Sequence, residues 1–86
     1  MNGIEFMCEE KDKPLEIQLE PEAHCYTIYP GNTIKFIPTN SNDNFSWILS
    51  ISHDNKGVQL IPGPFNSYED IEIYMNGERI VNIASS

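Results

Sequence analysis

Apolar residues recur at every second position through most of this chain, and almost nowhere at the spacing of three and four residues that a helix requires. In the segment 15–20, for example, leucine and isoleucine alternate strictly with glutamate and glutamine. Such alternation is typical of a strand with one buried face and one face in water. The pattern predicts extended segments at residues 4–8, 15–19, 24–29, 33–37, 45–53, 58–61, 68–75 and 78–83.

Turn-forming residues separate these segments. Pro30-Gly31 suits a turn because proline fixes φ and glycine supplies a positive φ. The sequences of 54–57, Asp-Asn-Lys-Gly, and of 76–77, Asn-Gly, each predict a hairpin, the second with a two-residue type I′ turn. The segment 62–67 contains two prolines, which lack an N–H donor, so we expect a loop that joins no ladder.

Together these signals predict an all-β fold, a small antiparallel β-sandwich or barrel of about 7–8 short strands joined by hairpins. The segment 45–53 is the longest predicted strand, and we expect it to be central. We expect one β-domain over residues 1–86, with 84–86 as a frayed C-terminal tail. An alternative places a helix from an N-cap at Ser67 to Met75, but the alternation there and the Asn-Gly turn favour a strand.

The composition limits the size and the partners of this domain. A chain of 86 residues should bury roughly 60–65% of the surface that its unfolded form exposes, enough for one core. Five Lys and Arg residues against thirteen Asp and Glu residues give a net charge of −8, which argues against binding to nucleic acid phosphates. No apolar run is long enough to span a bilayer, and residues 1–5 lack the pattern of a signal peptide, so we expect no membrane partner and a cytoplasmic location.

The two cysteines do not form a redox or zinc motif. Cys8 and Cys25 are too far apart for a CxxC pair and too few for a disulfide framework. We expect two reduced, buried thiols. A single disulfide that ties the first strand to the third remains open.

Metal chemistry is disfavoured by the spacing of its ligands. His24, Cys25, His53 and Met75 are the side-chain types of a copper site, but a cupredoxin-like site needs cysteine, histidine and methionine clustered on one late loop. Adjacent strand residues such as His24 and Cys25 point to opposite faces. No set of four zinc ligands is present either, so we predict no metal and no cofactor.

The sequence signal for catalytic residues is equally weak. His53 and Asp54 lie beside Ser50 and Ser52, which are the residue types of a nucleophilic triad. Asp54, however, opens a predicted hairpin turn, where its carboxylate is needed by the backbone, and there is no nucleophile elbow. A small β-domain also offers little room for a deep substrate cleft. We therefore expect no enzymatic activity.

The surface of the strand 68–75 carries the first candidate binding residues. Period-two alternation places Tyr68, Asp70, Glu72 and Tyr74 on the outer face. The two-residue turn at 76–77 sets Arg79 opposite Tyr74, within reach of a cation–π contact. This face mixes acidic and aromatic side chains.

A second acidic ridge is expected on the strand 15–19, formed by Glu16, Gln18, Glu20 and Glu22. Two interpretations of both ridges remain open. The charges can simply keep a small domain soluble and protect an edge strand. They can also attract a basic partner by electrostatic steering, with tyrosine in the contact.

Two further aromatic residues have open roles. Phe65, in the loop 62–67, is expected to pack over one end of the core, with an anchor in an interface as the alternative. Trp47 is expected in the core.

The size, the acidity, the Pro30-Gly31 hairpin and the closing hairpin at 71–78 resemble small acidic all-β immunity or inhibitor proteins of bacteria and phages. Such proteins neutralise a toxin, often a basic nuclease, and the resemblance implies that carboxylates are presented where the target expects phosphates. No individual residue role follows from it, because the shared features occur in many unrelated sheets.

The leading hypothesis is a non-enzymatic acidic protein that inhibits or sequesters a basic protein. The expected contact residues are Tyr68, Asp70, Glu72, Tyr74, Arg79, Glu16, Glu20 and Glu22. The alternative is a structural or assembly module that homodimerises or pairs through a β-edge. A third hypothesis is a small-ligand or metal site inside the sandwich.

Overall fold

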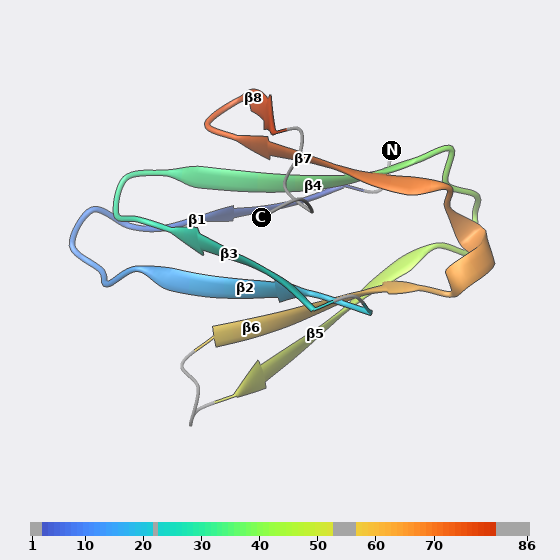
Figure 1. Cartoon of the computed structure of the whole chain (residues 1–86), viewed down its shortest axis with the longest axis horizontal. Helices are drawn as coiled ribbons and strands as arrows, with labels where there is room; N and C mark the ends of the chain where they lie inside the picture. Colours follow the sequence, from blue (N-terminus) through green and yellow to red (C-terminus); the bar gives the residue numbers. More distant parts are fainter. Residues whose placement is uncertain (1–2, 22, 53–56, 81–86) are drawn as a thin grey trace.

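Two four-stranded sheets stack face to face in the computed structural model, which describes residues 3–21, 23–52 and 57–80 (Figure 1). Sheet A has the strand order β1-β4-β7-β8 and sheet B the order β3-β2-β6-β5. The strands are β1 (Ile4–Met7), β2 (Leu15–Leu19), β3 (His24–Ile28), β4 (Thr33–Thr39), β5 (Ser46–Ser52), β6 (Gly57–Gly63), β7 (Asp70–Met75) and β8 (Glu78–Ile80). This confirms the predicted all-β class and selects a sandwich over a closed barrel.

Neighbouring strands are antiparallel with one exception. β2 and β6 run parallel, with Ile17 opposite Val58 and Leu19 opposite Leu60. The parallel pair joins two antiparallel pairs, β2 with β3 and β5 with β6, into sheet B. Long-range pairing of this kind leaves no local signal in the sequence, so the strand order does not follow from the alternation of apolar residues.

β5 lies at one edge of sheet B, so the expectation that this segment is a central strand is wrong. Its length, the greatest of the predicted strands, suggested a central position. In the structure, Ile48 and Ile51 are 58% and 70% exposed, so several apolar side chains of this long strand are not buried.

Two prolines lie within strands. β6 continues through Pro62, where the sequence predicted a loop, and β4 continues through Pro38. Beyond Leu60 and Phe36, respectively, each of these strands has lost its pairing with one neighbour, β2 or β1. A strand accommodates a residue without an N–H where one side is unpaired, which explains why the ladders continue.

The turns follow the predicted chemistry. The backbone N–H of Asn32 donates to the carbonyl of Tyr29 at 3.0 Å, and Gly31 between them has φ +87°, as a type II turn requires. Asn76 and Gly77 both have positive φ, 54° and 86°, which fits the predicted type I′ hairpin. β5 and β6 pair as predicted. Of the turn predicted at 54–57, residues 54–56 lie outside the described residues.

The helical alternative for the segment 67–75 is wrong, because β7 is a strand. A short 3₁₀ turn, η1 (Phe65–Ser67), precedes it and carries the chain from sheet B to sheet A. The predicted strand therefore begins at Asp70, two residues later than the sequence pattern suggests.

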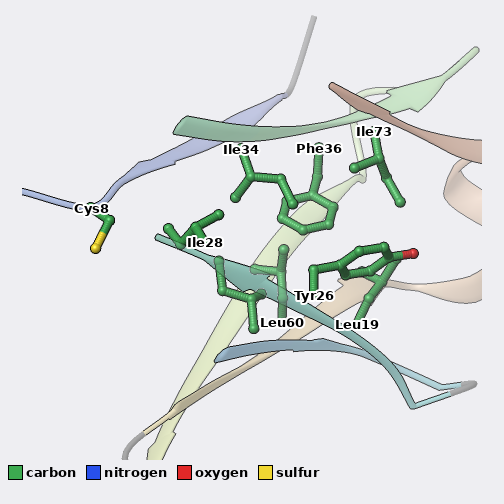
Figure 2. Close-up of a cluster of buried hydrophobic side chains, with 9 residues drawn as sticks. Cys8, Leu19, Tyr26, Ile28, Ile34, Phe36, Leu60 and Ile73 are labelled. Atoms are coloured by element: carbon green, nitrogen blue, oxygen red, sulfur yellow. The ribbon is translucent and has the colours of Figure 1, made fainter. Parts of the chain in front are cut away.

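Buried side chains from both sheets meet in one core (Figure 2). Phe36 of β4 is fully buried, and its ring makes edge contacts with Phe6, Tyr26 and Trp47 at centroid distances of 6.1, 5.7 and 6.4 Å. Because Tyr26 and Trp47 belong to sheet B, this ring joins the two layers. The predicted packing of Trp47 against the core is confirmed.

Candidate functional site

The predicted cross-strand pair on sheet A is present. Tyr74 of β7 lies opposite Arg79 of β8. The Tyr74 hydroxyl donates to Glu72 Oε1 at 3.0 Å, and Arg79 Nη2 lies 3.7 Å from Glu72 Oε2. The hydrogen bond to Glu72, together with desolvation, raises the pKa of Tyr74 above its ordinary value. The carboxylate of Glu72 is thus occupied by two neighbours of its own sheet.

The charges on the outer face of sheet A alternate in sign across its strands. Lys35 of β4 lies opposite Tyr74, and Glu5 of β1 lies opposite Lys35. Two cations, Lys35 and Arg79, therefore lie among the carboxylates of this face. Asp70 is exposed at the start of β7, and its Oδ1 accepts the backbone N–H of Ile71 at 2.8 Å. Of the acidic residues predicted on this strand, Glu72 is therefore paired with a cation.

Tyr68 does not share this face. It precedes β7, and its ring makes an edge contact with the buried Phe45 at 5.5 Å and a tilted contact with Phe65 at 6.4 Å. The alternation of the predicted strand placed it outside, but the strand begins only at Asp70. Tyr68 is half-buried among aromatic rings at the end of the sandwich.

Phe65 itself is 81% exposed, so the expectation that it packs over the end of the core is wrong. It lies on η1, where the chain crosses between the sheets, and Tyr68 packs against the buried Phe45 instead. Its use as an anchor in an interface stays a prediction.

The ridge on β2 has a different environment. Glu16 is exposed, while Gln18 and Glu20 are half-buried on the same outer face of sheet B. Gln18 Nε2 donates to Glu20 Oε2 at 2.6 Å, and Gln59 Nε2 of β6 approaches the same oxygen at 3.4 Å. Two amide groups therefore hold the Glu20 carboxylate in position. Glu22, the last residue of the predicted ridge, lies outside the described residues.

The two predicted ridges do not adjoin. β2 belongs to sheet B and β7 to sheet A, and their outer faces point away from each other across the core (Figure 1). The predicted contact residues that the structure describes therefore form no single surface. Glu72, Tyr74 and Arg79 form one cluster and Glu16 and Glu20 another.

The outer face of sheet B is acidic without compensation in the described strands. No Lys or Arg belongs to β2, β3, β5 or β6. The same face also carries apolar surface that the analysis of the sequence missed. Ile48 of β5 lies opposite Ile61 of β6, and both point to the side of Glu16 and Gln18. The signal for it was the segment 46–52, where the outer alternation of serines is interrupted by one isoleucine.

No protein-family model, no curated protein and no solved structure matches this chain. A function for it therefore has to be inferred from its own residues.

The cysteines and the metal-binding residue types add no second site among residues 3–21, 23–52 and 57–80. Both cysteines are free; Cys8 is buried as expected, whereas Cys25 is exposed, contrary to expectation. No group of three or more potential metal-binding side chains occurs in the described parts of the chain. None of the described helical segments is long and apolar enough to cross a membrane.

Proposed function

We propose that the protein is a non-enzymatic binding protein that inhibits or sequesters a basic protein, as an immunity protein does a toxin or nuclease. The outer face of sheet B makes the contact. The observation that supports this proposal is the difference in charge between the two outer faces. Glu16 and Glu20 have no cation beside them in the described strands of sheet B, whereas Glu72 is paired with Arg79.

An acidic face whose described strands carry no lysine or arginine serves association in two ways. It attracts a basic partner over roughly the Debye length of ~10 Å and so raises the rate of encounter. The carboxylate of Glu20 is already held by Gln18 and Gln59, so less side-chain freedom is lost when the complex forms.

The apolar side chains on this face add buried apolar area to the binding energy, which charge alone does not supply. Ile48 is 58% exposed and lies opposite Ile61, within the same sheet surface as the carboxylates. Protein interfaces combine an apolar centre with a polar rim, and here Ile48 and Ile61 supply the first and Glu16 and Gln59 the second. Inhibition of a nuclease would follow if these carboxylates occupied the positions of substrate phosphates.

Two double variants test this assignment. The immobilised chain is used to isolate a basic protein from the lysate of its own cells at low salt, and that protein is then purified. Binding is measured for Glu16→Lys with Glu20→Lys on sheet B, and for the matched control Asp70→Lys with Glu72→Lys on sheet A. Both variants raise the net charge from −8 to −4, so only the position of the charge differs.

We expect the sheet B variant to slow association by about 10-fold or more, and the sheet A variant by less than about threefold. Added salt should weaken the wild-type complex. Equal effects of the two variants would remove sheet B as the contact face. A complex that ignores both variants and salt would contradict the electrostatic proposal as a whole.

A further inference from the structure

The free edge of β5 differs from every other edge in the sandwich. β5 is the last strand of sheet B, and among the strands that the structure describes it pairs with β6 alone (Figure 1). It is seven residues long. It contains no charged residue and no proline. Edge strands in natural proteins are normally short, or protected by charges or proline, because an open ladder invites pairing with another chain.

The other three edges are protected or offer little to a partner. β1 has four residues and an exposed Glu5, and β8 has three residues that include Glu78 and Arg79. β3 is uncharged, but its exposed side chains at positions 25 and 27 are small, and it lies beside the carboxylates of β2. A strand of a second copy that paired with β3 would bury little apolar surface. It would also lie close to the Glu16 carboxylate of β2.

β5, by contrast, exposes large apolar side chains on both of its faces. Ile48 on the outer face is 58% exposed, and Leu49 and Ile51 on the inner face are 43% and 70% exposed. These are three of the six large hydrophobic side chains that are exposed in the described residues. Figure 1 shows the reason for the inner face, because the C-terminal end of β5 points away from sheet A.

We propose that β5 pairs antiparallel with β5 of a second copy of this chain, so that two B sheets form one continuous eight-stranded sheet across a two-fold axis at Leu49. This inference does not depend on the proposed function, because it concerns the edge of sheet B and not its acidic face. It gives β5 a second neighbouring strand, as a central strand has.

Charge does not exclude a second copy as the occupant of this edge. Each chain carries a net charge of −8, so two copies repel one another over most of their surfaces. No charged side chain of β5 adds to that repulsion at the edge itself. A basic partner strand, the alternative occupant, would find no carboxylate on β5 with which to pair.

The sequence of β5 is also complementary to itself. In a two-fold antiparallel pair, the register that uses all seven residues places Leu49 opposite Leu49. The same register places Trp47 opposite Ile51. On the inner face, every cross-strand pair is then apolar, and the exposed Leu49 and Ile51 side chains of both copies are covered. Such pairs stabilise a sheet by roughly 0.2–1 kcal/mol each beyond the ladder itself.

The first test is the mass of the full chain in solution, measured by sedimentation equilibrium from about 1 µM to about 1 mM. We expect a shift from the monomer mass of 9.8 kDa to twice that value. The variant Ile51→Lys should raise the dimer dissociation constant by at least about 10-fold, because it places a charge in the apolar row. The matched control is Met7→Lys on β1, a residue of similar exposure at 63%, and should leave the dissociation constant unchanged.

The second test fixes the register. In a Cys25→Ser background, Leu49→Cys places two thiols across the two-fold axis, where the Cα atoms of an antiparallel pair lie ~4.5–5.5 Å apart, within disulfide range. Mild oxidation with diamide should give a covalent dimer. Ile48→Cys should not, because residue 48 faces residue 50 in this register.

A chain that stays monomeric over the whole concentration range would overturn the inference, and would leave a strand of another protein as the occupant of β5. A dimer that Met7→Lys weakens as much as Ile51→Lys would place the interface elsewhere. Equal cross-linking at positions 48 and 49 would contradict the proposed register. None of these results depends on a basic partner, so failure here is distinguishable from failure of the proposed function.

Discussion

The two outer faces of this sandwich both carry glutamates and yet differ in electrostatic character. On sheet A, the carboxylate of Glu72 is bound by Tyr74 and Arg79, and Lys35 lies on the strand next to it. On sheet B, the carboxylate of Glu20 is held by neutral amides, and Glu16 has no cation on any described strand of its sheet. Both segments show the same alternation of acidic and apolar residues in the sequence.

The difference arises from which strands become neighbours. Lys35 and Tyr74 are far apart in the sequence and lie opposite each other only because β4 pairs with β7. β2 pairs instead with β3 and β6, neither of which contains a lysine or arginine. An acidic stripe in a sequence therefore becomes an acidic surface only if the pairing partners leave it uncompensated.

The largest expected effect concerns the core that the two sheets share. Phe36→Ala should lower the free energy of unfolding by about 3–5 kcal/mol, because a fully buried ring that contacts both sheets is removed. Urea unfolding monitored by Trp47 fluorescence and by circular dichroism measures the loss. The two signals should coincide, because both sheets contribute side chains to one core and should unfold together.

The control for this variant is Met7→Ala on sheet A, whose side chain is 63% exposed and should change stability by less than about 0.5 kcal/mol. If Phe36→Ala does not fold, Phe36→Leu gives a smaller loss that remains measurable. Separate transitions for the two signals would mean that the two sheets unfold independently. The two outer faces would then belong to two separate folding units.

The fold class and the placement of side chains on faces were predictable, because alternation of period two and turn residues act locally. Asn76 and Gly77 adopt the expected positive φ values, and Tyr74 lies opposite Arg79, since a two-residue turn fixes the register of its hairpin. The sequence of these few residues determines both features.

The strand order was not predictable, and the errors at the site follow from it. β2 pairs with β6 in parallel, across some forty residues of chain, and this pairing leaves β5 at the edge. The same missing information separated Glu16 and Glu20 from Glu72 and Tyr74. The prediction for Tyr68 failed for a different reason. The alternation in the sequence starts at residue 68, but β7 begins only at Asp70, after η1.

A smaller effect separates the two cysteines. Cys25 is exposed on sheet B, whereas Cys8 is buried, and its Sγ lies 3.3 Å from the carbonyl of Lys13. Burial, and then the nearby Asp12 and Glu9, raise the pKa of the Cys8 thiol, so less of it is the reactive thiolate. Cys25 should react with Ellman's reagent at least about 100-fold faster than Cys8, which requires local opening.

Cys25→Ser provides the control, because only the slow reaction should remain in that variant. The experiment sharpens the comparison, since it reports directly on access to the outer face of sheet B. Equally fast labelling of both thiols in the wild type would mean that the loop holding Cys8 opens readily. Protection of Cys25 at high protein concentration alone would indicate that self-association covers the outer face and not just the β5 edge.

The smallest expected effect tests whether Glu72, Tyr74 and Arg79 on sheet A interact with one another and so leave the Tyr74 hydroxyl unavailable to a partner. The pKa of Tyr74 is raised above its ordinary value, chiefly by the hydrogen bond to Glu72. The protonated hydroxyl therefore stabilises the fold fully below about pH 10, and this contribution is lost as the pH rises through the higher folded pKa. Glu72→Ala removes the acceptor and should lower the pKa of Tyr74 toward about 10, measured by the phenolate absorbance with Tyr74→Phe to identify the transition. An unchanged titration would mean that the Tyr74 hydroxyl is available to a partner, and sheet A would again compete with sheet B as the binding face.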